Sequence, residues 1–471
     1  MKSGIPMTVS TFQRARAARW LSPIMIFIVA SCLAPSRQLA RPPLEEELPW
    51  ESMSASLSLG DPGKALESYE NALADQPLAR DSRLLHARLL MTAGRLADAR
   101  EELALLLAEQ PSDAEVLYNL SLLEGLEGNR EKQRALLEKV VSLVPGHADA
   151  LAGLGDLVLE RDDAPAALSS FEAALTADPR NLVGLLGMTE IRAREKDWAG
   201  SAEMAARAIE AEPGYPFAYI DRARARRALG QTAGAILDLS RAIALDPSYP
   251  WSYIDRGKLY LGEARREEAL ADFGMATTLG PEIFSGWAYR GQMLYDAGRD
   301  DEALSDFERV AILRPDYWFV FPPLGELYFV KGEWANARRY FLEAYRYEEE
   351  EHSYLLLAAL AARRAGDRKG AAELLEGALP AISRDSWQYE VARFLLKPEA
   401  DLPLAARADR EKSRTVRVRM LFYLADQAFA SGRERAAASW LAEIDGSGAP
   451  TAIETRLARR EFARLIGQKQ E

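Results

Sequence analysis

The sequence of 471 residues has few of the side chains that build metal centres or disulfide frameworks. It contains one cysteine and three histidines, which excludes a disulfide scaffold and argues against a thiolate or histidine metal site. Acidic residues outnumber basic ones by 71 to 59, so the positive field that nucleic-acid binding requires is absent. Hydrophobic residues make up 48%, which excludes a disordered chain. We expect no metal, no cofactor and no nucleic-acid partner.

Acidic residues are also missing from the first 44 positions. Four basic residues, the last of them Arg19, precede an apolar run of eleven residues from Trp20 to Ala30. At ~1.5 Å per residue this run is too short to cross a hydrocarbon core of ~30 Å. A basic flank, a short apolar core and small residues after it are typical of a secretory signal peptide.

The apolar run ends in Val29-Ala30-Ser31-Cys32, and Cys32 is the only cysteine. This segment resembles the lipobox of bacterial lipoproteins, in which the cysteine becomes the lipidated N-terminus. The resemblance implies a signal peptide over 1–31, lipidation of Cys32 and a location in the bacterial cell envelope. The membrane would be the outer membrane, at its periplasmic face, or the cell membrane. If the cell does not process this motif as a lipobox, the chain would be anchored by its N-terminus or be a soluble periplasmic protein.

The segment 32–45 is rich in proline and polar residues, which favours an extended tether. Beyond it, prolines recur every 34 residues, and each ends a helical pattern. They are Pro77, Pro111, Pro145, Pro179, Pro213, Pro247, Pro281 and Pro315. Turns that contain glycine or aspartate lie half a period earlier, so two helices of about 12–15 residues alternate in each period.

Small and large residues recur at fixed positions within each period. A small residue in the first helix, as at Gly257 and Gly291, is matched by an alanine and a bulky residue, as at Ala269 and Phe273, in the second. This pattern resembles the tetratricopeptide repeat. The resemblance implies an all-α fold, a right-handed superhelical solenoid of about eleven helix–turn–helix units whose first helices line a concave groove.

The repeat accounts for most of the chain. We predict ten units over 46–385, a degenerate repeat or insertion over 386–417, an eleventh unit over 418–451 and a polar-faced capping helix within 452–471. No segment remains for a catalytic domain, and we name no catalytic residue. The histidines lie in distant units, and we interpret the acidic pairs Asp162-Asp163 and Asp300-Asp301 as helix caps.

Arg222, Arg256 and Arg290 occupy the same position in successive units, beside Asp221 and Asp255 in two of them. They form a ladder that either binds carboxylates of a partner or, as we favour, pairs with acidic residues of the same repeats.

Aromatic residues are concentrated in 215–347, which holds 24 of the 41 in the chain. Several fall on the face of the first helix that lines the groove in the tetratricopeptide family, together with polar residues that suit the rim of a binding site. The candidate partner-binding residues are Phe217, Arg224, Trp251, Lys258, Gln292, Tyr295, Phe319, Glu326 and Phe329.

The sequence therefore predicts a non-enzymatic, lipid-anchored scaffold for protein–protein interactions in the bacterial envelope. Its expected partners are envelope proteins or peptides, and the lipid attaches it to the membrane. Two alternatives stay open. The chain could be an accessory subunit of an envelope enzyme or assembly machine, or it could carry a small ligand enclosed by the surplus aromatic residues.

Overall fold

The computed structural model describes residues 48–58, 60–72, 79–397, 402–446 and 452–467. The predicted signal peptide, Cys32 and the tether lie outside these ranges. Within them all regular secondary structure is helical, as the all-α prediction requires, with 25 α-helices, one 3-10 helix and no strand. No helix in the described ranges has both the length and the apolar character needed to span a bilayer.

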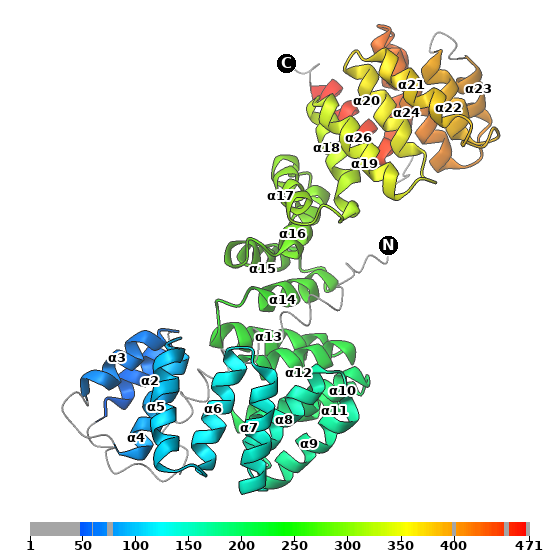
Figure 1. The fold of residues 1–471 in the computed structure, drawn as a ribbon. Helices are drawn as coiled ribbons and strands as arrows, with labels where there is room; N and C mark the ends of the chain where they lie inside the picture. Colours follow the sequence, from blue (N-terminus) through cyan, green and yellow to red (C-terminus); the bar gives the residue numbers. More distant parts are fainter. Residues whose placement is uncertain (1–47, 59, 73–78, 398–401, 447–451, 468–471) are drawn as a thin grey trace. The chain divides into compact units, whose positions relative to one another are not determined.

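The helices belong to two compact units, divided between Pro247 and Ser248. In the first unit they are α2 (Trp50–Ser58), α3 (Pro62–Ala72), α4 (Arg80–Thr92), α5 (Leu96–Glu109), α6 (Ala114–Leu126), α7 (Arg130–Leu143), α8 (Ala148–Glu160), α9 (Ala164–Ala177), α10 (Leu182–Arg194), α11 (Trp198–Ala211), α12 (Pro216–Ala228) and α13 (Thr232–Leu245). Successive helices pack as antiparallel pairs, and each pair packs on the next (Figure 1), which makes the chain an α-solenoid.

In the second unit the helices are α14 (Pro250–Gly262), α15 (Arg266–Leu279), α16 (Phe284–Asp296), α17 (Asp300–Leu313), η1 (Trp318–Val320), α18 (Phe321–Lys331), α19 (Trp334–Tyr347), α20 (Ser353–Arg364), α21 (Arg368–Ala378), α22 (Trp387–Leu396), α23 (Leu402–Arg410), α24 (Arg414–Ala430), α25 (Glu434–Gly446) and α26 (Ile453–Gly467). The same pairing continues from α14–α15 to α20–α21 and recurs in α24–α25, and α26 follows this last pair.

In four repeats a glycine of the first helix faces a phenyl ring of the second. A Cβ built on this glycine would lie between 2.6 and 3.0 Å from the ring, at or below the shortest contacts that real Cβ atoms make. The pairs are Gly155 with Phe171, Gly257 with Phe273, Gly291 with Phe307 and Gly325 with Phe341. The alternation of small and large residues in the sequence is therefore the close packing of paired helices.

The turn within each helix pair has a left-handed backbone. Ten of these turns lie 34 residues apart, with φ between 58° and 83°, at residues 60, 94, 128, 162, 196, 230, 264, 298, 332 and 366. Seven carry glycine, which adopts this conformation without steric cost. Asp162, Lys196 and Ala264 adopt it without that freedom, so these three turns are strained relative to the others.

The two acidic pairs that we interpreted as helix caps do not have the same role in the structure. Asp163 caps α9, because its carboxylate accepts a hydrogen bond from the Ala166 amide at 3.2 Å. Asp300 is already inside α17, whose N-cap is Arg299. The cap interpretation is wrong for Asp300, whose carboxylate instead binds Arg460 at 2.8 Å.

The repeat becomes irregular after α21. The segment 386–417, predicted as a degenerate repeat or insertion, contains α22, α23 and the first residues of α24. Ser413 separates α23 from α24, because its hydroxyl accepts a hydrogen bond from the Val416 amide and caps α24. The next left-handed turn, Gly432, comes 66 residues after Gly366. Two regular 34-residue repeats would place it 68 residues after Gly366.

Two substitutions at equivalent turns, one from alanine to glycine and one from glycine to alanine, test whether the left-handed backbone of Ala264 is strained. We expect Ala264→Gly to raise the free energy of unfolding by ~1 kcal/mol, and Gly298→Ala to lower it by a similar amount, because a left-handed L-residue costs ~1–2 kcal/mol. A Cβ at Gly298 would meet no atom within 4 Å, so the effect comes from the backbone alone. Urea unfolding followed by circular dichroism measures both changes, and a shift of the same sign in the two variants would contradict the explanation.

Candidate binding surface

The nine candidate groove residues divide between the two units. Phe217 and Arg224 lie on α12 of the first unit. The other seven lie on α14, α16, η1 and α18 of the second unit. Phe217 is buried, with its ring 5.5 Å from that of Tyr215, and Arg224 donates to Asp221 at 3.2 Å. The prediction that these two residues bind a partner remains a prediction.

Four candidates of the second unit are open to solvent at least in part. Phe319 is 45% exposed, and its ring stacks on that of Trp318 at 4.2 Å. Trp251 is half-buried. The half-buried Lys258 contacts Asp255 at 2.9 Å, and the exposed Gln292 donates to Asp296 at 2.8 Å. Phe319 is therefore the candidate aromatic residue that a partner could reach most directly.

The remaining three candidates, Tyr295, Glu326 and Phe329, are buried. Phe329 packs edge-on against Trp334, with ring centroids 5.0 Å apart. The Tyr295 hydroxyl donates a hydrogen bond to the carboxylate of Glu326, whose side chain is fully inaccessible to solvent. While the structure holds this arrangement, a partner cannot reach these side chains.

Two arginines of α26 cover Tyr295 and Glu326. Arg456 donates to the Tyr295 hydroxyl at 2.8 Å and to one oxygen of Glu326 at 3.0 Å. Arg460 donates to the other oxygen of Glu326 at 3.1 Å and to Asp300 at 2.8 Å. The guanidinium groups of both arginines lie within 6 Å of the Tyr295 ring centroid, at 5.7 and 5.1 Å. We call Tyr295, Asp300 and Glu326 the acidic site.

Burial perturbs the ionisation of this cluster. Burial raises the pKa of Tyr295 above its ordinary value, and the negative charge of Glu326 adds to the increase, so the phenol stays protonated and donates. Burial also raises the pKa of Asp300, although Arg460 opposes the change. Arg456 behaves differently, because burial alone would lower its pKa but the charge of Glu326 raises it on balance. The Tyr295 phenol and the Arg456 guanidinium therefore both keep their protons and act as hydrogen-bond donors in this cluster.

The opposite side of α26 contacts α20 and α24. Glu454 lies 3.2 Å from Arg419 and accepts a hydrogen bond from the Tyr423 hydroxyl at 3.3 Å. Glu461 lies 3.5 Å from Arg364, whose guanidinium also binds Asp426 at 2.7 Å. Burial raises the pKa values of Glu454 and Asp426, against the opposing charge of the nearby arginines.

The sequence analysis did not identify Arg456 and Arg460 as site residues. Their spacing of four residues in a basic helix was a visible signal, because residues four apart lie on one helix face. Their acidic partners are 130 to 161 residues away in the chain. No local pattern links residues so far apart.

The three repeated arginines are structural. Each binds both oxygens of an aspartate sixteen residues further on in the same repeat, with contacts between 2.7 and 3.0 Å. The pairs are Arg222 with Asp238, Arg256 with Asp272 and Arg290 with Asp306. The favoured interpretation, pairing within the same repeats, is confirmed.

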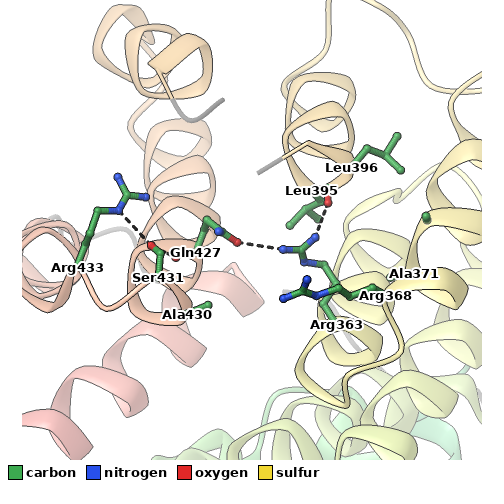
Figure 2. Close-up of a pocket in the computed structure, with 10 residues that line it drawn as sticks. Arg363, Arg368, Ala371, Leu395, Leu396, Gln427, Ala430, Ser431 and Arg433 are labelled. Carbon is green, nitrogen blue, oxygen red and sulfur yellow. Dashed lines mark hydrogen bonds between the residues drawn. The ribbon is translucent and has the colours of Figure 1, made fainter. Parts of the chain in front are cut away.

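A pocket of about 620 Å³ lies in the second unit, beside α20, α21, α22 and α24 (Figure 2). Arg363, Arg368 and Arg433 line it, together with leucine and alanine side chains. Arg363 donates to the Leu395 carbonyl at 2.6 Å and to the Gln427 amide oxygen at 3.0 Å, so it links three helices. No aromatic side chain lines this pocket, so it does not supply the aromatic enclosure that a carrier of a small ligand would need.

The histidines do not come together. His86 stacks on Tyr69 with ring centroids 5.4 Å apart, and His147 accepts a hydrogen bond from the Ala150 amide at 3.3 Å as the cap of α8. In the part of the chain that the structure describes, no group of three or more histidine, cysteine, aspartate or glutamate residues could hold a metal ion.

The helices are paired, the turns within the pairs share a left-handed backbone, and glycine positions allow close packing. These features define a helical repeat protein. Three family models of the tetratricopeptide repeat match the chain, one over 56–122, one over 223–262, and one over 127–181, 254–317 and 323–386. The chain belongs to the tetratricopeptide repeat family. Repeats of this kind are modules of protein–protein interaction, so the fold is that of a protein-binding scaffold.

Three solved structures each align with about half of the chain. The pilF protein of Pseudomonas aeruginosa is 16% identical, with a TM-score of 0.41, over 50% of this chain and 97% of its own. A tetratricopeptide repeat protein of Parabacteroides merdae is 21% identical, with a TM-score of 0.36, over 53% and 98%. The C-terminal part of a repeat protein of Cytophaga hutchinsonii is 12% identical, with a TM-score of 0.38, over 51% and 99%. A search of curated proteins gave no match.

The structural arginine pairs lead to a prediction about stability. Arg290→Ala leaves the carboxylate of Asp306, 2% exposed, without its main partner, and we expect a loss of ~3 kcal/mol in the free energy of unfolding. Arg299→Ala is the control, because its partner Glu302 is solvent-exposed and such pairs contribute less than ~1 kcal/mol. Urea unfolding compares the two variants, and equal losses would contradict the assignment of Arg290 to the core.

Proposed function

We propose that this protein is a non-enzymatic, lipid-anchored scaffold that binds envelope proteins or peptides in a bacterial cell. The observation that carries the proposal is the architecture. In each described range between residues 48 and 467, helices of the repeat follow one another without a segment of another fold class. Stacked helix pairs present extended surfaces for protein ligands, and their function is binding.

The sequence around Cys32 supports the lipid anchor and the envelope location. The basic flank, the short apolar run and the single cysteine are the three features of a lipoprotein signal, and they occur in the required order. The anchor would hold the scaffold at the outer membrane, on the periplasmic face, or at the cell membrane. A scaffold in that position also fits the accessory subunit of an envelope enzyme or assembly machine.

Metabolic labelling with an azido fatty acid tests the anchor. Wild-type protein should incorporate the label, and Cys32→Ala should lose it and accumulate as a precursor, because Cys32 supplies the only thiol for acylation. Ser31→Ala is the matched control, since alanine is also small and leaves the thiol in place. Unchanged labelling of Cys32→Ala would show that the protein is not lipidated at this residue.

Crosslinking in native membranes, followed by mass spectrometry, tests the binding surface. We expect a partner that crosslinks to wild type to be reduced several-fold with the double variant Trp251→Ala and Phe319→Ala, since these aromatic residues are the accessible candidates. Ile312→Ala removes an exposed side chain of α17 and is the control. Equal recovery of the partner with all variants would move the binding site away from these residues.

A further inference from the structure

The first part of the C-terminal helix α26 is buried on more than one side. Glu454, Thr455, Leu457 and Ala458 are each fully buried. Consecutive residues of a helix differ by about 100° in direction, so these four side chains point to several sides of α26. The polar-faced cap expected from the sequence would bury one face only. α26 instead resembles a ligand helix held by its surroundings.

The enclosing surface belongs to the second unit. α26 packs against α18, α24 and α25 (Figure 1). On one side Arg456 and Arg460 bind the acidic site, which α16, α17 and α18 supply. On the other side Glu461 contacts Arg364 of α20. Helices α16, α17 and α18 therefore lie on one side of α26, and α20 and α24 lie on the other.

The acidic site is specific for two positive charges one helical turn apart. Glu326 uses one carboxylate oxygen for Arg456 and the other for Arg460. Asp300 binds the second guanidinium, and the Tyr295 hydroxyl accepts from the first. A buried carboxylate is costly without a charged partner, so this site requires an occupant that supplies both cations.

We propose that the acidic site is a receptor for a helix that carries two arginines four residues apart, and that α26 is its occupant in the free chain. A partner protein binds by presenting a helix of this pattern in place of α26. The inference rests on the proposed scaffold function and names the class of partner that this surface takes.

The chain connection makes the displacement selective. Six residues separate the end of α25 from the start of α26, so α26 competes at an effective concentration of ~1 mM or more. Because α26 already fills the acidic site, a competing helix binds the wild-type chain with a lower apparent affinity than it would have for the empty site. Only a helix that matches the acidic site well displaces α26.

A peptide competition experiment with the full chain tests the proposal. The probe is a fluorescent synthetic peptide with the sequence of residues 452–467, and fluorescence anisotropy measures its binding. The double variant Arg456→Ala and Arg460→Ala should bind the peptide at least ~10-fold more tightly than wild type, because its own α26 no longer fills the site. A peptide with the same two alanine substitutions should bind at least ~10-fold more weakly than the unmodified peptide.

Two further variants serve as matched controls. Arg459→Ala removes an arginine of α26 that contacts Asp445 at 3.5 Å instead of the acidic site, and it should behave as wild type. Adding Glu326→Gln to the double variant should abolish the gain in peptide binding, since the amide keeps the shape but loses the charge. Circular dichroism establishes that each variant is folded.

Several outcomes would overturn the proposal. A folded double variant that binds no peptide would show that α26 is a fixed structural element, and binding that survives Glu326→Gln would place the peptide elsewhere. If the wild-type chain dimerised through these two arginines, the occupant of the acidic site would be α26 of a second copy. The proposal of a separate partner protein would then be overturned.

Hydrogen exchange of the wild-type chain provides a measurement that does not depend on folded variants. Excess peptide should accelerate exchange in α26 but not in α24, and unchanged exchange would overturn the proposal. The purified chain needs no membrane in these experiments, so their failure leaves the anchored scaffold intact. Failure of the labelling experiment likewise does not affect peptide binding.

Discussion

In four repeats the packing of a phenyl ring against a glycine of the paired helix sets how closely the two helices approach. It appears between Gly257 and Phe273 and again between Gly325 and Phe341, where no side chain larger than hydrogen fits. A single helix pair buries too little apolar surface to be stable alone, so each pair also requires its neighbours. The 34-residue period follows from this requirement, because every pair must offer the same surface to the next.

Several buried carboxylates of the described residues are bound by arginine, at two different separations in the sequence. Asp272 and Asp306 are bound by arginines of the same repeat, sixteen residues away, and stabilise the helix pair. Glu326 is bound by Arg456 and Arg460, which come from the end of the chain. The first arrangement maintains the repeat, and the second closes the second unit around α26. Pairing of arginine with a buried carboxylate therefore joins helices within a repeat and also joins distant parts of the chain.

This difference affects which surfaces a partner can use. Phe319 on η1 is exposed and Trp251 on α14 is half-buried, whereas Tyr295 and Phe329 are buried. The aromatic residues of 215–347 thus include both core residues and surface residues.

Local patterns alone were sufficient for the architecture. The proline spacing, the small and large positions and the left-handed turns each involve residues within one repeat, so the all-α solenoid and the pairing of Arg256 within its own unit could be predicted. The N-cap of α24 at Ser413 was not predicted. The contacts of α26 with the acidic site could not be predicted either. They join residues 130 or more positions apart, and only the folded path of the intervening helices brings Arg456 to Glu326.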